Sequence, residues 1–214
     1  MIIVHHLGIS QSDRIVWLME ELGLPYELKW YDRGPDFLAP AEYRAQHPAG
    51  TAPIIEDGDL VMAESTAIVE YISQRHGGGR LSMPVASPDY PHYLYWMQFN
   101  NNLQAALFIK RSSQAAADPA AAQKNPIFVT MNRRVDGLYV ALERRLGEAA
   151  YLGGAEFSCA DIMSAFNLTS LTGLGARVVD DSLPNTKAYL QRIVSRPAYQ
   201  KAMAIAGPRA SKPL

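Results

Sequence analysis

The sequence holds a single cysteine, Cys159, among its 214 residues. One thiol excludes an internal disulfide and any metal site built from several cysteines. Its 20 lysines and arginines nearly balance 21 acidic residues, so the totals carry no signature of nucleic-acid or anionic-membrane binding. No apolar run approaches the ~20 residues that span a bilayer, and the opening MIIVHHLGIS does not resemble a signal peptide. These absences favour a cytoplasmic protein that acts on small molecules, without a nucleic-acid or membrane partner.

The first 80 residues predict a compact α/β domain. Residues 2–7 and 26–31 are typical of strands, and between them residues 13–22 show the apolar spacing of a helix that ends at Gly23. Strand, helix and strand in so short a span indicate a βαβ unit with a parallel pair. A short helical piece follows near residues 41–46.

A hairpin and a third helix complete this domain. Asp57-Gly58, flanked by residues 53–56 and 59–62, is a strong hairpin signal. A helix then starts near Glu64-Ser65 and stops by Gly77. The order βαβ-α-ββα matches a thioredoxin-like domain over about residues 1–80.

Strand signals vanish after a linker at residues 77–91, which contains Gly77, Gly78 and Gly79 with Pro84, Pro88 and Pro91. We expect an all-helical bundle domain over about residues 88–207. Its expected helices cover 90–109, the amphipathic run from Phe128 to Leu146, a segment starting at Ser158, 185–195 and 198–206. Ser158 and Asp161 have the spacing of a capping box at the start of a helix, and Cys159 within it is expected to be packed rather than reactive.

Three strings of residues resemble one known family. They are DGDLVMAESTAI after Pro53, the segment IIVHHLGISQSDRIVWLMEELGLPYEL, and the closing SRPAYQKAM. Together with the capped helix at Ser158 they resemble the cytosolic glutathione S-transferase superfamily, in its serine-type form (theta-like or a related bacterial class). The resemblance covers nearly the whole chain.

The resemblance implies a glutathione site at the first domain. Pro53 is expected to follow a cis peptide bond, so that the main chain of Ala52 pairs with the cysteinyl part of glutathione. Glu64 and Ser65 are expected to hold the γ-glutamyl group, and a helix N-terminus favours such a carboxylate. Thr51 stands where the family often has a lysine that contacts the glycyl carboxylate. Without the family, the same residues are an ordinary strand-start proline and an N-cap serine.

Ser10 matches the serine that activates the thiol in the family. Ser12 is a rival donor, and Ser10 with Asp13 also fits a capping box. Residues 1–25 contain no tyrosine and no cysteine, which argues against a tyrosine-type enzyme and excludes a cysteine-based redox mechanism at this position. His5 and His6 point to opposite faces of a strand and are poorly placed to chelate one metal.

The expected function is glutathione transfer to a small, mostly hydrophobic electrophile, in a detoxification role. Glutathione serves as co-substrate, with no other cofactor and no metal, and the protein is expected to be a homodimer. The electrophile pocket is expected near Ile9, Leu103, Leu107 and Phe108. The alternatives are a glutathione-dependent peroxidase, disulfide reductase or isomerase on the same site, and a non-enzymatic transferase-like module that binds other proteins.

Asn100, Asn101 and Asn102 are poor helix formers in succession. They indicate either a role at a cleft or interface, or a locally distorted and solvated turn.

Overall fold

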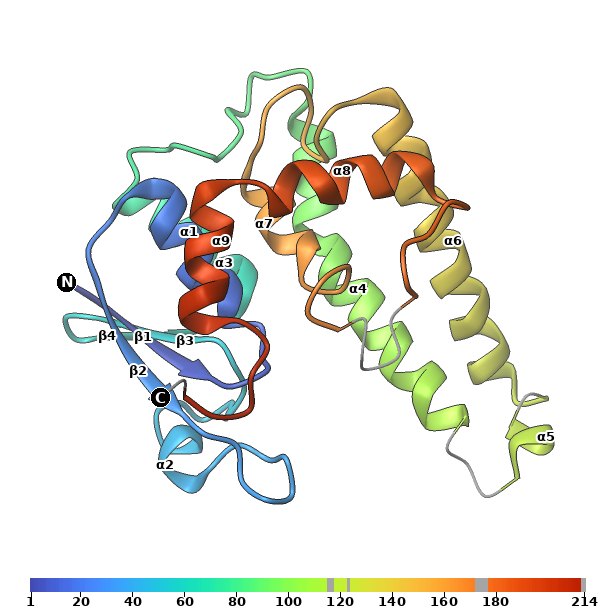
Figure 1. Ribbon diagram of the computed structural model, residues 1–214, viewed down its shortest axis with the longest axis horizontal. Helices are drawn as coiled ribbons and strands as arrows, with labels where there is room; N and C mark the ends of the chain where they lie inside the picture. The colour runs from blue at the N-terminus through green and yellow to red at the C-terminus, as the bar shows by residue number, and fades with distance from the viewer. Residues whose placement is uncertain (115–117, 123, 172–176, 213–214) are drawn as a thin grey trace. The chain divides into compact units, whose positions relative to one another are not determined.

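The structure, a computed structural model, describes residues 1–114, 118–122, 124–171 and 177–212. The chain divides into two compact units (Figure 1). The first contains residues 1–85 together with 192–214, and the second contains residues 86–191.

The first unit is built on a four-stranded sheet in the order β2-β1-β3-β4. β1 is parallel to β2 and antiparallel to β3, and β4 is antiparallel to β3. The strands are β1 (Ile2–Leu7), β2 (Tyr26–Tyr31), β3 (Ile54–Asp57) and β4 (Leu60–Ala63). The expected thioredoxin-like arrangement is therefore confirmed.

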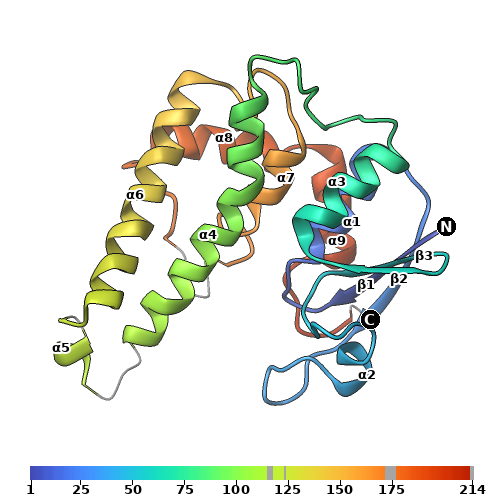
Figure 2. The same ribbon diagram turned by 180° about the vertical axis from the view of Figure 1, so that it is seen from behind.

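Helices cover both faces of this sheet. Figures 1 and 2 show α1, α3 and α9 on one face and the short α2 on the other. Under α2, the side chains of Leu7, Tyr43, Ile54 and Ala63 form a buried cluster. The helices are α1 (Asp13–Leu22), α2 (Ala41–Arg44), α3 (Ser65–Arg75) and α9 (Pro197–Ala206).

Helix α1 has the bounds that its apolar spacing predicts. It ends because Gly23 adopts the left-handed conformation (φ 63°), which lets its amide and that of Leu24 bond to carbonyl oxygens of the last turn. Its apolar side chains, among them Ile15 and Leu18, are fully buried.

The hairpin is present, with its turn one residue later than expected. Asp57 pairs with Leu60, so the two turn residues are Gly58 and Asp59. Gly58 has φ 61°, and glycine takes this conformation at no steric cost. The first position of the turn therefore requires a positive φ. Gly58 occupies that position, and not Asp57 as we had expected.

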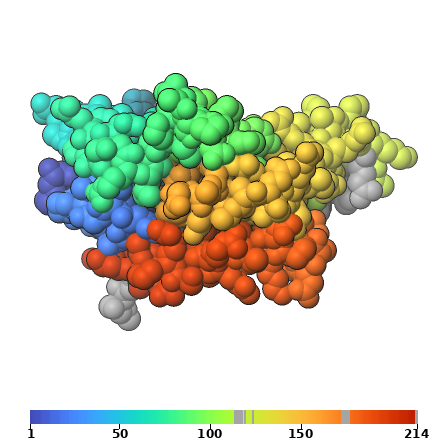
Figure 3. Space-filling view, turned by 90° about the horizontal axis from the view of Figure 1, so that it is seen from above, coloured from blue at the N-terminus to red at the C-terminus, as the bar shows by residue number. Residues whose placement is uncertain are grey.

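The last helix, α9, belongs to the first unit. Trp17 of α1 meets Tyr199 edge-on at a ring distance of 4.9 Å. Arg196 donates two hydrogen bonds, of 2.6 and 2.7 Å, to the carboxylate of Glu21. In the space-filling view the red C-terminal residues lie directly against the blue residues of the first unit (Figure 3). The expected helical domain, which ran to residue 207, is thus too long at its C-terminal end.

The second unit is helical within its described residues, as expected. Helix α4 packs against both α6 and α7. Asp161 accepts hydrogen bonds from the amides of Ser158 and Leu152 and from the hydroxyl of Tyr189, and the capping box is present. Cys159 is buried, as expected. The helices that begin in this unit are α4 (Tyr90–Gln114), α5 (Pro119–Ala122), α6 (Pro126–Glu148), α7 (Cys159–Ala165) and α8 (Pro184–Val194).

The three consecutive asparagines lie inside α4, so the alternative of a distorted turn is wrong. Asn100 is fully buried, and its side-chain and main-chain oxygens accept hydrogen bonds from Asn167. Tertiary packing therefore overrides the weak helix propensity of this stretch. In the described part of the chain, no helix has the length and apolar character needed to cross a membrane.

Candidate functional site at the end of the central strand

The C-terminal end of β1 is the point where the three predicted glutathione-binding segments meet. His5 of β1 pairs with Ile54, the first residue of β3, so the chain just before β3 lies beside the end of β1. Ala52 accordingly packs against the buried cluster that contains Leu7. Ala63, which pairs with Ile54 from the other side, is followed closely by α3. The sheet register alone thus gathers these segments at one edge.

The peptide bond between Ala52 and Pro53 is cis, as the resemblance implied. Ala52 is half-buried and the neighbouring Thr51 is exposed, so this segment has main-chain groups close to solvent. Glu64 also has an unusual backbone conformation, with φ 73° although it is not glycine.

Helix α3 begins at Ser65, as expected. Glu64 occupies the N-cap position and makes no capping hydrogen bond. The first amides of a helix have no partner within the helix and attract anions. The hydroxyl of Ser65 contacts the side-chain oxygen of Gln11 at 3.4 Å. That contact ties the loop after β1 to the start of α3.

Ser10 and Ser12 share a network of short hydrogen bonds in the loop between β1 and α1. The Ser10 hydroxyl donates to the carbonyl oxygen of Leu7 at 2.7 Å and lies 2.7 Å from the Ser12 hydroxyl. The N-cap position of α1 falls on Ser12, whose hydroxyl makes no capping bond. The amide of Asp13 bonds to the main-chain oxygen of Ser10 rather than to its side chain. Ser10 therefore does not form the capping box with Asp13 that we kept as an alternative.

The two histidines of β1 have separate environments, as strand alternation predicts. His5 bonds to the hydroxyl of Tyr31 and to the carboxylate of Glu56. His6 lies on the opposite face, where its Nδ1 is 2.8 Å from the Ser12 hydroxyl. Sequence reasoning considered His6 only as a metal ligand and found it poorly placed, because nothing local shows that Ser12 bonds to it.

Arg33 is a second residue that sequence reasoning missed. Its guanidinium donates hydrogen bonds to the carbonyl oxygens of Gly8 and Ile9, at 2.6 and 2.8 Å, and to that of Phe37. Ile9 has φ 47°, a conformation that is strained for a β-branched residue. Arg33 thus holds the loop that carries Ser10. No motif surrounds Arg33 that could have indicated this role.

Comparison with known proteins identifies the fold and the family together. A crystal structure of a glutathione S-transferase from Actinobacillus pleuropneumoniae has a TM-score of 0.85 and 33% sequence identity, over 100% of this chain and 97% of that one. The chain belongs to the glutathione S-transferase family. Residues 10–75 match the N-terminal domain of glutathione S-transferases and residues 100–197 match the C-terminal domain.

Curated relatives extend along nearly the whole of this transferase. Glutathione S-transferase 3 of Schizosaccharomyces pombe is 29% identical, over 92% of this chain and 85% of its own length. Glutathione S-transferase GstB of Escherichia coli K12 is 27% identical, over 90% and 92%. The expected superfamily and its enzymatic function as a glutathione transferase are therefore confirmed, and the alternative functions are not favoured.

The residues expected to line the electrophile pocket of this transferase differ in exposure. Leu103 is fully buried and Leu107 nearly so, whereas Phe108 is 73% exposed and Ile9 is half-buried. Of the four, Phe108 is the side chain most open to a second molecule. The pocket itself stays a prediction.

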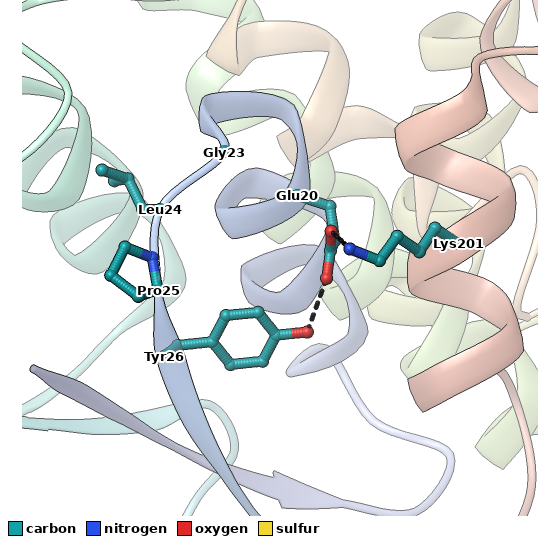
Figure 4. Close-up of a pocket in the computed structure, with 6 residues that line it drawn as sticks. All are labelled: Glu20, Gly23, Leu24, Pro25, Tyr26 and Lys201. Atoms are coloured by element: carbon teal, nitrogen blue, oxygen red, sulfur yellow. Dashed lines mark hydrogen bonds and ion pairs between the residues drawn. The ribbon is translucent and has the colours of Figure 1, made fainter.

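One open pocket of about 420 Å³ lies at the far end of α1 from Ser10. Figure 4 shows Glu20 at its centre, bonded to the hydroxyl of Tyr26 at 2.9 Å and to Lys201 at 2.6 Å. Its polar groups thus satisfy one another, and it contributes nothing to the serine site. Among the described residues of the transferase, no group of three or more histidine, cysteine, aspartate or glutamate side chains is placed to hold a metal ion.

Proposed function

We propose that this transferase binds glutathione at the end of β1 and that Ser10 stabilises its thiolate for attack on a small, mostly hydrophobic electrophile. The observation that carries this proposal is the placement of the Ser10 hydroxyl. It lies in the loop after β1, which Gln11 ties to Ser65 at the start of α3, and the chain before β3 at Ala52 lies beside the end of the same strand. This arrangement supports a serine-type enzyme of a theta-like or related bacterial class.

Burial favours Ser10 over Ser12 as the donor. Ser10 is 8% exposed, whereas Ser12 is fully buried and bonds to His6, to Ser10 and to the amide of Leu7. Ser10 is therefore the hydroxyl whose proton can turn outward to a ligand, by leaving the carbonyl oxygen of Leu7.

The chemistry requires a modest change in acidity. The attacking species is the thiolate, and a free thiol has a pKa near ~8.5. A hydrogen bond to a charged acceptor contributes about 1.5–3 kcal/mol, and one pKa unit corresponds to about 1.4 kcal/mol. One hydroxyl donor can thus lower the pKa of the bound thiol by roughly one to two units. The serine stays protonated throughout and needs no base.

The remaining contacts to glutathione are proposed at the same site. In this proposal the main chain of Ala52 beside cis-Pro53 pairs with the cysteinyl part of glutathione, and Glu64 and Ser65 hold the γ-glutamyl group. Thr51 bonds the glycyl carboxylate through a neutral hydroxyl. Glutathione is the co-substrate, and the enzyme acts as a cytoplasmic homodimer without further cofactor.

A serine-by-serine comparison tests the proposal. The wild type, Ser10→Ala and Ser12→Ala are assayed for conjugation of glutathione to an activated aromatic halide, and glutathione affinity is measured by calorimetry. We expect Ser10→Ala to lower kcat/KM at neutral pH by roughly tenfold or more, because the bound thiol loses its donor. Glutathione affinity changes little. If Ser12→Ala abolishes turnover and Ser10→Ala does not, the donor is wrongly assigned.

A further inference from the structure

Four groups form a continuous chain of short hydrogen bonds beneath the loop after β1. His6 Nδ1 lies 2.8 Å from the Ser12 hydroxyl, which lies 2.7 Å from the Ser10 hydroxyl, which lies 2.7 Å from the carbonyl oxygen of Leu7. The other ring nitrogen of His6, Nε2, is buried and has no hydrogen-bond partner among the described residues. The imidazole therefore acts through Nδ1 alone.

A count of protons fixes the direction of this chain. Three short contacts need three protons, and the two hydroxyls supply only two. If the proton of the imidazole were on Nε2, one of the three contacts would bring two lone pairs together. With the proton on Nδ1, His6 donates to Ser12, Ser12 donates to Ser10, and Ser10 donates to Leu7. Every short contact then holds one proton.

The environment of His6 keeps its ring neutral. The side chain is fully buried, and the ring of Trp30 covers it at 4.3 Å. Burial lowers the pKa of His6 to about 3. At neutral pH the ring thus carries one proton, and with that proton on Nδ1 the buried Nε2 keeps a lone pair rather than an unpaired donor.

We propose that His6 is a positioning residue for the thiol chemistry: by donating from Nδ1 to Ser12, it commits the Ser12 proton to Ser10 and so leaves the Ser10 proton for the sulfur of bound glutathione. This inference rests on the proposed role of Ser10. When glutathione binds, the Ser10 hydroxyl turns from Leu7 to the thiolate, and the chain from His6 to the sulfur runs in one direction. Hydrogen bonds aligned in this way strengthen one another.

The first test needs no substitution. The ¹⁵N NMR spectrum of the wild-type enzyme, with labelled histidine, reports which ring nitrogen of His6 is protonated. We expect the proton on Nδ1 both without and with glutathione. A proton on Nε2 would reverse the chain and overturn the inference.

The second test measures the pKa of the glutathione thiol in the complex, from the ultraviolet absorbance of the thiolate against pH. We expect His6→Leu to raise this pKa by roughly 0.5 unit, because Ser12 is then free to turn away from Ser10. His6→Asn retains an N–H donor where Nδ1 lies and restores most of the shift. His5→Asn is the matched control on the opposite face of the same strand, and it leaves the thiol pKa unchanged.

A double variant separates positioning from simple packing. Because His6 acts through Ser12, His6→Leu combined with Ser12→Ala raises the thiol pKa no further than Ser12→Ala alone. Additive shifts, or an unchanged thiol pKa in His6→Leu, overturn the inference while leaving the role of Ser10 intact. If instead the wild type does not lower the thiol pKa of bound glutathione, the proposed function itself fails. Should His6→Leu not fold, the NMR measurement of the protonated ring nitrogen and the thiol pKa in His6→Asn still test the role of His6.

Discussion

Arg33 donates a hydrogen bond of 2.8 Å from Nη2 to the carbonyl oxygen of Ile9, the residue directly before Ser10. Ile9 has φ 47°. Such a backbone conformation costs about 1–3 kcal/mol and persists only where surrounding contacts hold it in place. Arg33 also bonds the carbonyl oxygen of Gly8, so two successive peptide groups are fixed by one guanidinium. The position of the Ser10 hydroxyl therefore depends on a residue that never needs to touch the substrate.

Replacing Arg33 with methionine removes this clamp while keeping most of the side-chain length. We expect Arg33→Met to lower the free energy of unfolding by about 2 kcal/mol, because the partly buried carbonyl oxygens of Gly8 and Ile9 lose their donor. Turnover with glutathione falls further than the loss of stability explains, because Ser10 is displaced. Urea unfolding and steady-state kinetics measure both effects. Arg144→Met is the control, since Arg144 is exposed and, among the described residues, bonds only Glu148. Equal effects of the two variants would contradict the prediction.

Ser65→Ala tests the anion site at the start of α3. We expect the Kd for glutathione to rise roughly ten- to a hundredfold, because a hydroxyl donor to a carboxylate is lost. Ser73→Ala is the matched control on the same helix. The hydroxyl of Ser73 is buried and bonds Arg80 and Ser82, so its removal costs stability and leaves the Kd unchanged. Calorimetric titration with glutathione distinguishes the two, and equal Kd values argue against the site.

The buried His6 gives the enzyme a predictable sensitivity to acid. Burial lowers the pKa of His6 to about 3 in the folded protein, whereas the unfolded chain titrates near ~6.5. The unfolded state thus binds the proton first, and the stability that neutral His6 provides is complete above pH ~6.5 and is lost as the pH falls toward 3.

Between pH 7.5 and pH 5.0 we expect the wild type to lose about 2 kcal/mol more stability than His6→Asn does. Urea unfolding at the two pH values measures the difference. If His6→Asn loses as much stability on acidification as the wild type, then His6 is charged or accessible in the folded protein.

Asp161 anchors the second unit. Its carboxylate accepts from the amides of Ser158 and Leu152, and from the hydroxyl of Tyr189 at 3.0 Å. We expect Asp161→Ala to lower the free energy of unfolding by about 3 kcal/mol or more, because several buried donors lose their acceptor. Asp181→Ala changes it by less than about 0.5 kcal/mol, because the Asp181 side chain is 92% exposed and pairs with Lys187 at the surface. Urea unfolding measures both variants. A comparable loss of unfolding free energy in the two would show that Asp161 does not anchor the second unit.

Local patterns predicted most of the secondary structure. The bounds of β1, α1 and β2 follow from apolar spacing and from Gly23, all of which act within a few residues. The hairpin turn was displaced by one residue, because Asp57-Gly58 and Gly58-Asp59 are both good turn sequences. Only the cross-strand pairing of Asp57 with Leu60 decides between them.

Contacts between distant parts of the chain could not be predicted. Strand alternation separated His5 from His6, but it does not say that Ser12 bonds one of them. The resemblance to a family predicted Ser10, Pro53 and Ser65 as residues of the glutathione site. It carried no information on Arg33. The role of Arg33 depends on the position of the loop after β2, beside Gly8 and Ile9.

The membership of α9 in the first unit has a consequence for biosynthesis. Trp17 of α1 is translated well before its edge-on partner Tyr199, because the whole second unit lies between them in the sequence. The N-terminal half of the nascent polypeptide therefore leaves the ribosome with one helical surface still uncovered, and such surfaces attract chaperones. We expect folding of the first unit to be completed only after residues 197–206 have emerged.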